Sequence, residues 1–199
     1  MLKRSVKTSS PTPRLPAGYE RIPVRTTYLQ MQANPVAEPP APPAGCTVER
    51  WAKPEVHEYR KLFAAVGRAW GWSGRLIMKE EELQAVLNAD ATEIYRLRCG
   101  GETAGFAELD RSAAGQAEIA YFGLLPAFIG RGLGKFLLSW AIHRAWQGKT
   151  QRVWLHTCQY DHPQALAVYL KAGFSVYDRQ VEMQPYAEEF IRNSLTPCG

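Results

Sequence analysis

The chain has 199 residues, 46% of them hydrophobic and 22% charged, and a formal net charge of +5. This length suits one ordinary domain with an extension, and no apolar run approaches the roughly 18 residues that a membrane helix requires, which excludes transmembrane helices. Six basic and two acidic residues precede Cys46, so only +1 remains for the rest of the chain, which argues against a nucleic-acid-binding groove on the body.

The cysteines and the first residues of the chain indicate the cellular compartment and the redox state of the thiols. Cys46, Cys99, Cys158 and Cys198 are far apart and form no CxxC pair, which favours neither a zinc site nor a disulfide framework. The opening MLKRSVKTSS is not followed by the apolar core of a secretory signal. We therefore expect a cytoplasmic protein with reduced thiols, no metal and no membrane association.

Residues 1–45 are predicted to be a proline-rich, mildly basic arm, because their composition favours extended backbone over a packed core. Within the arm, residues 25–31 (RTTYLQM) have the β-branched and aromatic content of a short strand. This strand is expected to lie against the domain or against a second subunit, which leaves a homodimer open. Residues 46–199 are predicted to form the functional domain.

From Cys46 onward, strands and helices alternate. Three consecutive strands joined by glycine turns predict an antiparallel meander, and the later order of strand, helix and strand predicts a parallel neighbour. The predicted fold is therefore α/β (α+β), with a mixed, mostly antiparallel sheet and helices on both faces. The predicted strands are 46–51, 93–99, 103–110, 117–125, 152–158 and 174–183, and the predicted helices are 54–70, 79–87, 132–147 and 163–172.

The segment Ile129 to Lys135 (IGRGLGK) joins the end of a predicted strand to the start of a helix. Its glycines allow backbone N–H groups to turn toward one point, and the start of a helix adds partial positive charge there. A phosphate can bind at such a turn without a metal, and Arg131 and Lys135 add charge. The spacing is neither that of a P-loop nor that of a dinucleotide-binding strand and helix.

This turn resembles the signature of the GNAT acetyltransferase superfamily, in which Gln or Arg is followed by two residues, Gly, one residue, and Gly or Ala. Gly132 and Gly134 supply the glycines, and Ile129 replaces the usual Gln or Arg. A second segment, DHPQALAVYLKAGF, is similar to the family's Asn-x-x-Ala-x-x-x-Tyr-x-x-x-Gly-Phe pattern. His162 stands in the Asn position, and Ala165, Tyr169, Gly173 and Phe174 align. The resemblance covers about Cys46 to Met183.

The resemblance implies an N-acetyltransferase that uses acetyl-coenzyme A and transfers its acetyl group to an amine in a ternary complex. It also implies that the strand ending near Leu125 parts from the strand 152–158 and receives the pantetheine arm, with an N–H around Leu124 meeting the thioester oxygen. The residues expected to bind the cofactor are Phe122, Gly123, Leu124, Ile129, Gly130, Arg131, Gly132, Leu133, Gly134, Lys135, His162 and Tyr169.

Acyl transfer requires a neutral nitrogen and a proton for the departing thiolate. Glu118 is the first candidate base, directly or through a water, and strict alternation would place it on one face with Ala120, Phe122 and Leu124. Glu108 is the reserve candidate. Tyr169, on the buried stripe of its helix, is the candidate general acid, and its alternative role is that of a core aromatic residue.

The acceptor site is less well defined by the sequence. Trp70 and Trp72, between the first two predicted helices, are expected to line it, although tryptophans in such loops also pack for stability. The acceptor is a small-molecule amine or a protein amino group. The alternative function is a non-catalytic acyl-coenzyme A sensor or interaction module, in which the phosphate turn persists and Tyr169 only packs.

Overall fold

The structure is a computed structural model that describes residues 14–35, 38 and 40–195. In this part of the chain the strands are β1 (Tyr19–Met31), β2 (Cys46–Arg50), β3 (Thr92–Cys99), β4 (Glu102–Asp110), β5 (Gln116–Leu124), β6 (Arg152–Cys158) and β7 (Ser175–Ala187). The helices are α1 (Val56–Gly67), α2 (Glu80–Asn88), α3 (Leu133–Ala145), α4 (Ala165–Lys171) and α5 (Glu188–Leu195), with 3-10 turns at Arg68–Trp70 and Pro126–Phe128. None of these helices is long and apolar enough to cross a membrane.

The strands form one sheet in the order β2-β3-β4-β5-β6-β1-β7. The neighbours β2 to β5 pair antiparallel, as do β6 with β1 and β1 with β7, whereas β5 and β6 pair parallel. The mixed, mostly antiparallel sheet that the sequence predicts is thus confirmed. The predicted helix 54–70 divides into α1 and a 3-10 turn, and α5 was not predicted.

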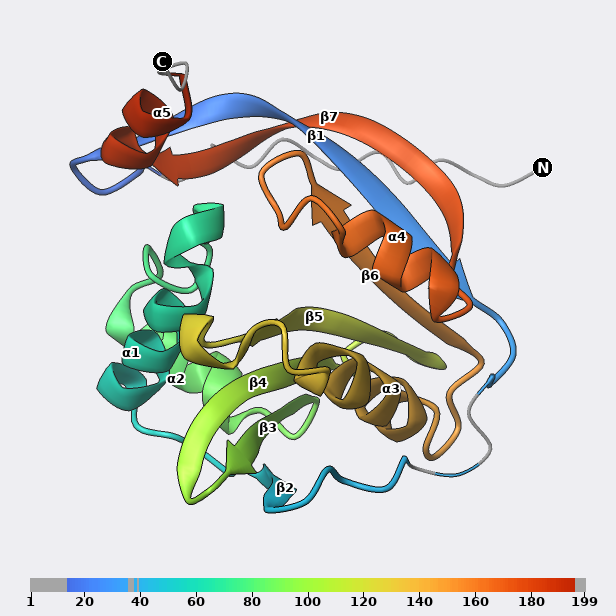
Figure 1. Ribbon diagram of the computed structural model, residues 1–199. Coiled ribbons are helices and arrows are strands. Elements are labelled where there is room, and N and C mark those ends of the chain that lie inside the picture. Colours follow the sequence, from blue (N-terminus) through green and yellow to red (C-terminus); the bar gives the residue numbers. More distant parts are fainter. Residues whose placement is uncertain (1–13, 36–37, 39, 196–199) are drawn as a thin grey trace.

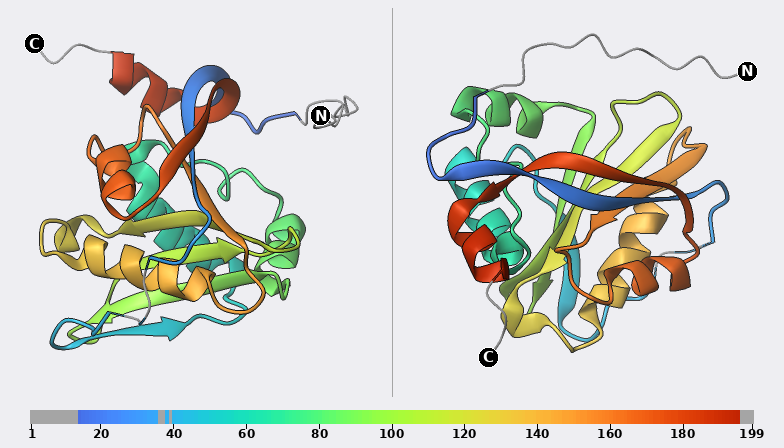
Figure 2. Two further views of the ribbon diagram at one scale, coloured as in Figure 1. Left: turned by 90° about the vertical axis from the view of Figure 1, so that its right-hand side faces the viewer. Right: turned by 90° about the horizontal axis from the view of Figure 1, so that it is seen from above.

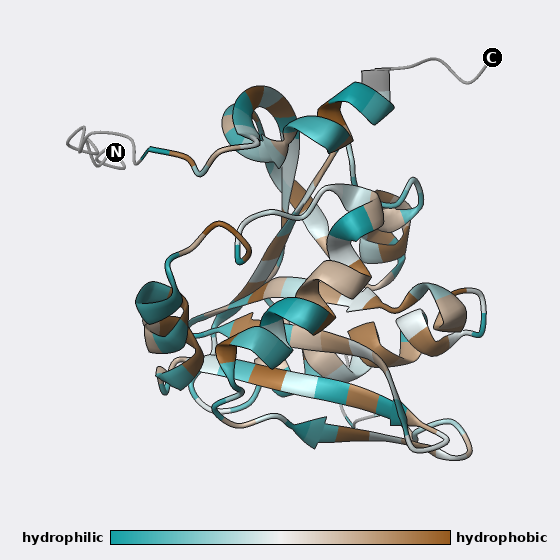
Figure 3. Cartoon of the chain, turned by 90° about the vertical axis from the view of Figure 1, so that its left-hand side faces the viewer, coloured by the Kyte–Doolittle hydropathy of each residue, from teal (hydrophilic) through white to brown (hydrophobic). Residues whose placement is uncertain are grey.

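Two hydrophobic clusters lie on opposite faces of the sheet. One joins α3 and α4 to the strands, and its fully buried members include Leu29, Leu137 and Leu155. The other joins α1 and α2 to β3, β4 and β5, with Phe63 and Phe106 at its centre. Helices therefore cover both faces, and Figure 3 shows hydrophilic and hydrophobic residues alternating along the helices of the side that faces the viewer.

The strands β1 and β7 form a long two-stranded ribbon. They pair from Tyr19 opposite Ala187 to Gln30 opposite Ser175, whereas β6 pairs with only the second half of β1, from Thr26 to Met31. The remaining half of the ribbon extends past β6 and arches over the molecule toward α1 (Figures 1 and 2). The short strand predicted at 25–31 is therefore the inner end of a longer strand, and the last strand runs past its predicted end at Met183.

The far end of the ribbon is fixed to the loop that follows α1. The hydroxyl of Ser73 donates a hydrogen bond to the carbonyl oxygen of Pro185. Tyr186 is buried, and its ring approaches Gly71 so closely that a Cβ added there would lie 2.7 Å from ring atoms. Gly71 also has a φ of +70°, so this position favours glycine for two independent reasons.

A disulfide joins Cys46 on β2 to Cys99 on β3, which corrects the expectation that these thiols are reduced. The two residues are directly opposite each other on antiparallel strands, with Cα atoms 4.1 Å apart. They are 53 residues apart in sequence, so their spacing carried no sign of the pairing. Cys158 is a free, half-buried thiol, and Cys198 lies outside the described residues.

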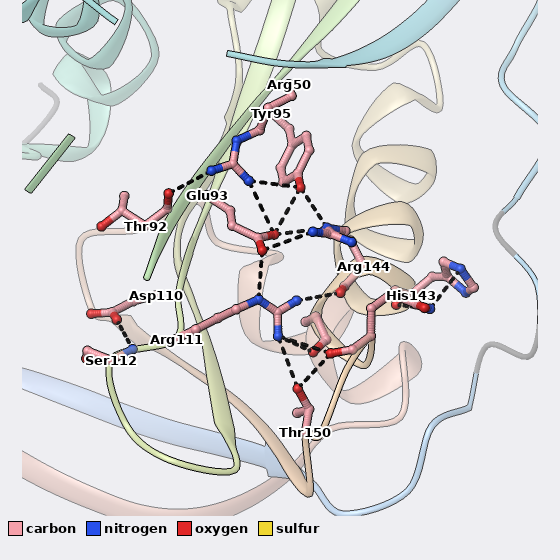
Figure 4. Close-up of polar contacts among 12 residues, drawn as sticks. Arg50, Thr92, Glu93, Tyr95, Asp110, Arg111, Ser112, His143, Arg144 and Thr150 are labelled. Carbon is pink, nitrogen blue, oxygen red and sulfur yellow. Dashed lines mark hydrogen bonds and ion pairs between the residues drawn. The ribbon is translucent and has the colours of Figure 1, made fainter. Parts of the chain in front are cut away.

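The C-terminal end of α3 is held by an ionic cluster around Glu93 of β3 (Figure 4). The Glu93 carboxylate accepts hydrogen bonds from Arg111 at 3.0 Å and from Arg144 at 2.9 Å. Arg111 also donates to the carbonyl oxygens of Arg144 and Ala145, which end α3. These contacts satisfy terminal carbonyl groups of the helix and fix it against the sheet.

Candidate active site

The parallel pairing between β5 and β6 is short. It runs from Gln116 opposite Arg152 to Glu118 opposite Trp154, and β5 then continues to Leu124 paired with β4 on its other side. Figure 1 shows the two strands diverging beyond this point. Leu125 donates its N–H to Ala104 of β4, so by alternation the N–H of Leu124 points away from β4, toward β6. The backbone of β5 thus has hydrogen-bonding groups free to take an added strand.

A bulge in β5 corrects the predicted faces of this strand. Leu109 pairs with Ile119 but Glu108 pairs with Tyr121, so Ala120 is the extra residue. Beyond it, Tyr121 packs with the α1 and α2 cluster, whereas Phe122 and Leu124 pack with the α3 cluster. Strict alternation from Glu118 to Leu124 was therefore wrong.

Gly123 lies on the same face as Tyr121 and permits close packing of α1 on β5. A Cβ added there would lie 2.4 Å from Val66 and 3.4 Å from Trp72. Any side chain at this position would therefore push α1 and the loop after it away from the strand.

The turn from Ile129 to Lys135 is exposed and leads into α3. Gly130 and Gly132 have φ values of +83° and +76°, and a Cβ added to either would meet no atom within 4 Å. Gly132 is the N-cap of α3. The backbone of the turn can therefore be approached closely by an anion, as the amides of a helix start require.

The side chains around the turn differ in their exposure. Leu133 is buried and anchors the turn to the α3 cluster, while Gly134 is half-buried against Leu124. The exposed Arg131 lies over the ring of Phe128, at 5.2 Å from its centroid. Ile129 and Lys135 are also exposed.

Tyr169 and His162 occupy opposite ends of the segment that includes α4. Tyr169 packs its ring edge-on against Phe174 and contacts the α3 cluster, as the predicted stripe requires. Burial raises the pKa of its phenol above the usual value, and the charge of Asp161 raises it further. His162 is exposed, and its Nδ1 accepts the N–H of Gln164, the N-cap residue of α4, at 3.1 Å.

Trp70 and Trp72 both reach the loop that follows β6. The indole N–H of Trp72 donates to Asp161 at 3.3 Å, and the ring of Trp70 meets that of His162 at 5.2 Å between centroids. The carboxylate of Asp161 also accepts the backbone N–H of Cys158 at 2.9 Å. The loop after α1, beside β5, is thus linked to the loop after β6, across the point where these strands diverge.

Glu108, the reserve base, is fully buried. Its carboxylate accepts hydrogen bonds from the hydroxyl of Tyr59 and from the guanidinium of Arg75. These contacts join α1, β4 and the loop before α2, and they favour a structural role for Glu108 over contact with an acceptor.

Glu118 has a partner, His156, that no sequence motif indicates. Its Oε1 lies 3.3 Å from Nδ1 of His156 on β6, and the side chains are 17% and 40% exposed, respectively. Burial alone would lower the pKa of His156, but the carboxylates of Glu118, Asp161 and Glu182 together outweigh it, and the pKa is raised. His156 lies just past Trp154, the last residue of the parallel pairing, so the pair stands where the strands begin to diverge.

Solved structures share this fold at low sequence identity. A GCN5-related N-acetyltransferase from Kribbella flavida is 21% identical, with a TM-score of 0.57 over 82% of this chain and 58% of that chain. An aminoglycoside acetyltransferase from an uncultured soil metagenomic sample, solved with trehalose, is 16% identical, with a TM-score of 0.56 over 70% of this chain and 95% of that chain. This chain thus shares the arrangement of strands and helices of these solved structures.

The model of the acetyltransferase (GNAT) family matches residues 48–174, so this chain belongs to the GNAT family of N-acetyltransferases. Use of acetyl-coenzyme A is typical of that family. A mycothiol acetyltransferase from Corynebacterium efficiens is 33% identical over 90 residues, which are 45% of this chain and 30% of that protein. The chain therefore matches less than a third of the length of this curated relative.

Proposed function

We propose that the protein transfers an acetyl group from acetyl-coenzyme A to an amine by direct attack in a ternary complex. The proposal rests on one observation, which is the divergence of β5 from β6 beyond Glu118. The divergence leaves one edge of β5 without a parallel partner, directly before the glycine turn that begins α3. The pantetheine arm would add along that edge, with the N–H of Leu124 directed at the thioester oxygen.

The diphosphate would bind at the exposed turn. The amides from Gly130 to Lys135 would donate to it, and the guanidinium and ammonium groups of Arg131 and Lys135 would add charge. The open space beside Gly130 and Gly132 fits this role, because nothing would obstruct the approach of the phosphates. Phe122 and Leu124 would border the arm on the α3 face, and His162 would border it from the entry to α4.

Two side chains, Glu118 and Tyr169, would transfer the protons of the reaction. Glu118 would accept the proton that the amine loses, since it stands at the last position of the parallel pairing and, between Ala117 and Ile119 of the α3 cluster, faces the α1 side of the sheet. Tyr169 would donate to the departing sulfur. Its raised pKa keeps the phenol protonated at working pH, so a proton is always present to give, and the phenol must regain it from solvent at once.

The acceptor would reach the site from the side of α1, between the loop that carries Trp70 and Trp72 and the β1–β7 ribbon. Glu118 and Glu182 on this face favour a cationic amine, and both interact with His156. Structural neighbours include the aminoglycoside acetyltransferase above and an enzyme described as IAA acetyltransferase from Bacillus cereus. The acceptor of this chain is proposed only as an amine, in a small molecule or in a protein.

A titration with acetyl-coenzyme A tests the donor site. Gly132→Glu should abolish binding, because a side chain at a φ of +76° and a negative charge would both oppose the diphosphate there. Gly148→Glu is the matched control, since Gly148 has a φ of +80° and a Cβ added there would also meet no atom within 4 Å, but it follows α3. Undiminished calorimetric affinity in Gly132→Glu would contradict the site.

The acceptor class is tested by release of free thiol from acetyl-coenzyme A. The panel contains putrescine, tryptamine, kanamycin and a glycyl tripeptide, which separate polyamines, arylalkylamines, aminoglycosides and peptide amino groups. A protein that binds acetyl-coenzyme A and acetylates none of these or other amines would instead be the non-catalytic acyl-coenzyme A sensor.

A further inference from the structure

We propose that His156, positioned by Glu118, is the group that takes the proton from the acceptor amine. This inference rests on the proposed acetyl transfer and changes the role of Glu118, which then acts through the imidazole. His156 is the catalytic residue in this arrangement, because its ring meets the acceptor, and Glu118 is a positioning residue.

The contact with Glu118 determines which ring nitrogen of His156 carries the proton. Glu118 contacts Nδ1 at 3.3 Å, so the proton of the neutral imidazole is held on Nδ1 and Nε2 keeps its lone pair. In an imidazole the two nitrogens lie on different sides of the ring, so Nε2 points away from Glu118. The side chain of His156 is 40% exposed, against 17% for Glu118, so the ring is the more accessible member of the pair.

Two aromatic rings also hold the imidazole in place. The ring of Tyr28 on β1 lies 5.7 Å from it and that of Trp154 lies 6.5 Å from it, between centroids. The hydroxyl of Tyr28 is itself fixed, because it donates to Glu182 on β7 at 2.7 Å. The imidazole is therefore held by residues of β5, β6 and β1, and Tyr28 links it to β7, which gives the ring the fixed position that a general base requires.

The charges that face His156 all stabilise its protonated form. They come from three elements: Glu118 on β5, Asp161 in the loop after β6, and Glu182 on β7. Together they outweigh the cost of burial, which opposes the charged ring, and the pKa is raised. An imidazole titrates closer to neutral pH than an ordinary carboxyl group does, which suits it to accept a proton from an amine.

The step balances with groups that are present. The amine nitrogen forms a bond to the thioester carbon while its proton moves to Nε2 of His156. The carbon–sulfur bond then breaks, and its electron pair goes to sulfur, which takes a proton from Tyr169. Solvent then removes the proton from His156 and returns one to Tyr169. The products are the amide and free coenzyme A.

The pH dependence of turnover tests the assignment. His156→Gln should lower kcat with the best acceptor of the four-member panel by about 10²-fold, with the affinity for acetyl-coenzyme A unchanged. Glu118→Gln should move the acidic limb of the kcat/KM profile to lower pH, because the imidazolium loses its counter-charge. Added imidazole should restore part of the rate of His156→Ala. His57→Gln on the exposed side of α1 is the control, expected to match the wild type.

A second measurement does not depend on turnover. Nitrogen-15 NMR of the histidine side chains should show the Nδ1-protonated tautomer of His156 at high pH, and its pKa should fall in Glu118→Gln. A wild-type rate in His156→Gln, or the opposite tautomer, would overturn the inference while leaving acetyl transfer intact. If the wild type acetylates no member of the panel, the proposed function loses its support, and the tautomer alone then decides whether His156 is positioned as a base.

Discussion

The ring of Tyr169 packs against the α3 cluster, and its hydroxyl is the proposed proton donor. Its ring is held edge-on against Phe174, so substitution by phenylalanine keeps the packed shape and removes one oxygen. Burial and the charge of Asp161 both raise the pKa of the phenol, so its phenolate form is costly unless a proton is quickly returned. Function and packing at this residue can therefore be separated by a change of one atom.

Tyr169→Phe should lower kcat by about 10²-fold and leave the affinity for acetyl-coenzyme A within about twofold, since only proton donation to sulfur is lost. Steady-state kinetics and calorimetric titration measure the two effects. Tyr19→Phe, at the distant start of β1, is the control. Equal rates for the wild type and Tyr169→Phe would assign Tyr169 to the core alone.

At the scale of elements, α3 links the ionic cluster to the proposed donor site. Its last carbonyl groups are held by Arg111, and its first residues form the glycine turn. Because a helix is stiff along its axis, fixing one end also fixes the direction of the amides at the other end. The Glu93 cluster is thus a support for the turn, although it lies at the opposite end of α3.

Glu93→Gln should destabilise the fold by about 2 kcal/mol at neutral pH, a low value for a buried ion pair because Arg144 is partly exposed. Burial of Glu93 opposes its ionisation, but hydrogen bonds and charges from Arg144, Arg111 and Tyr95 outweigh it and lower its pKa. The stability that Glu93 contributes is therefore present above its unfolded pKa and is lost as the pH falls through the folded value.

Urea unfolding of the wild type and Glu93→Gln at a series of pH values measures this contribution. The difference between the two proteins should shrink as the pH falls below 4.5, the ordinary pKa of a glutamate carboxyl group. Glu102→Gln, an exposed carboxylate on the neighbouring β4, is the control and should leave stability nearly unchanged. A difference that stays constant down to low pH would contradict the role of the Glu93 charge.

Sequence periodicity predicts most of the strands and helices, but it does not predict the register in which the strands pair. Residues 152–158 were predicted with the observed bounds, because an apolar run of that length between turns has few alternatives. The bulge at Ala120 has no signal in one sequence, since it depends on the pairing with β4. The disulfide between Cys46 and Cys99 was missed for the same reason, as it follows from strand register.

The site was only partly predictable. The glycine turn is contiguous in sequence and can be recognised from it, whereas the contact of Glu118 with His156 joins two strands through long-range pairing. His156 also stands between Leu155 and Thr157, where an isolated histidine on the open face of a strand carries no motif. His156 is recognised as a candidate for the proposed proton transfer only from its contact with Glu118 in the structure.

At the scale of the whole molecule, the β1–β7 ribbon connects the two ends of the described chain and closes over the side of α1 (Figure 2). Its far end is held by Tyr186, which packs against Phe190 of α5 and against Tyr160, with centroids 5.4 and 5.1 Å away. The position of the ribbon relative to α1, and hence the proposed acceptor site, depends on this aromatic cluster.

Tyr186→Ala should destabilise the fold by about 3 kcal/mol, the cost of removing a buried aromatic ring. It should also raise the KM for the amine while leaving the affinity for acetyl-coenzyme A unchanged, because the ribbon is remote from the glycine turn. Val181→Ala, at a side chain of the same strand that is 68% exposed, is the control. An unchanged acceptor KM together with the lost stability would separate the ribbon from the acceptor site.

The place of β1 in the sheet has a consequence for biosynthesis. It leaves the ribosome before every other described strand, yet both of its neighbours, β6 and β7, are made after all the other described strands. Until then its polar backbone has no permanent partner, and the nascent chain must keep that strand from pairing with other polypeptides. Closure of the sheet is therefore a long-range event that must await synthesis of β6 and β7, and β7 completes the surface on which the amine would bind.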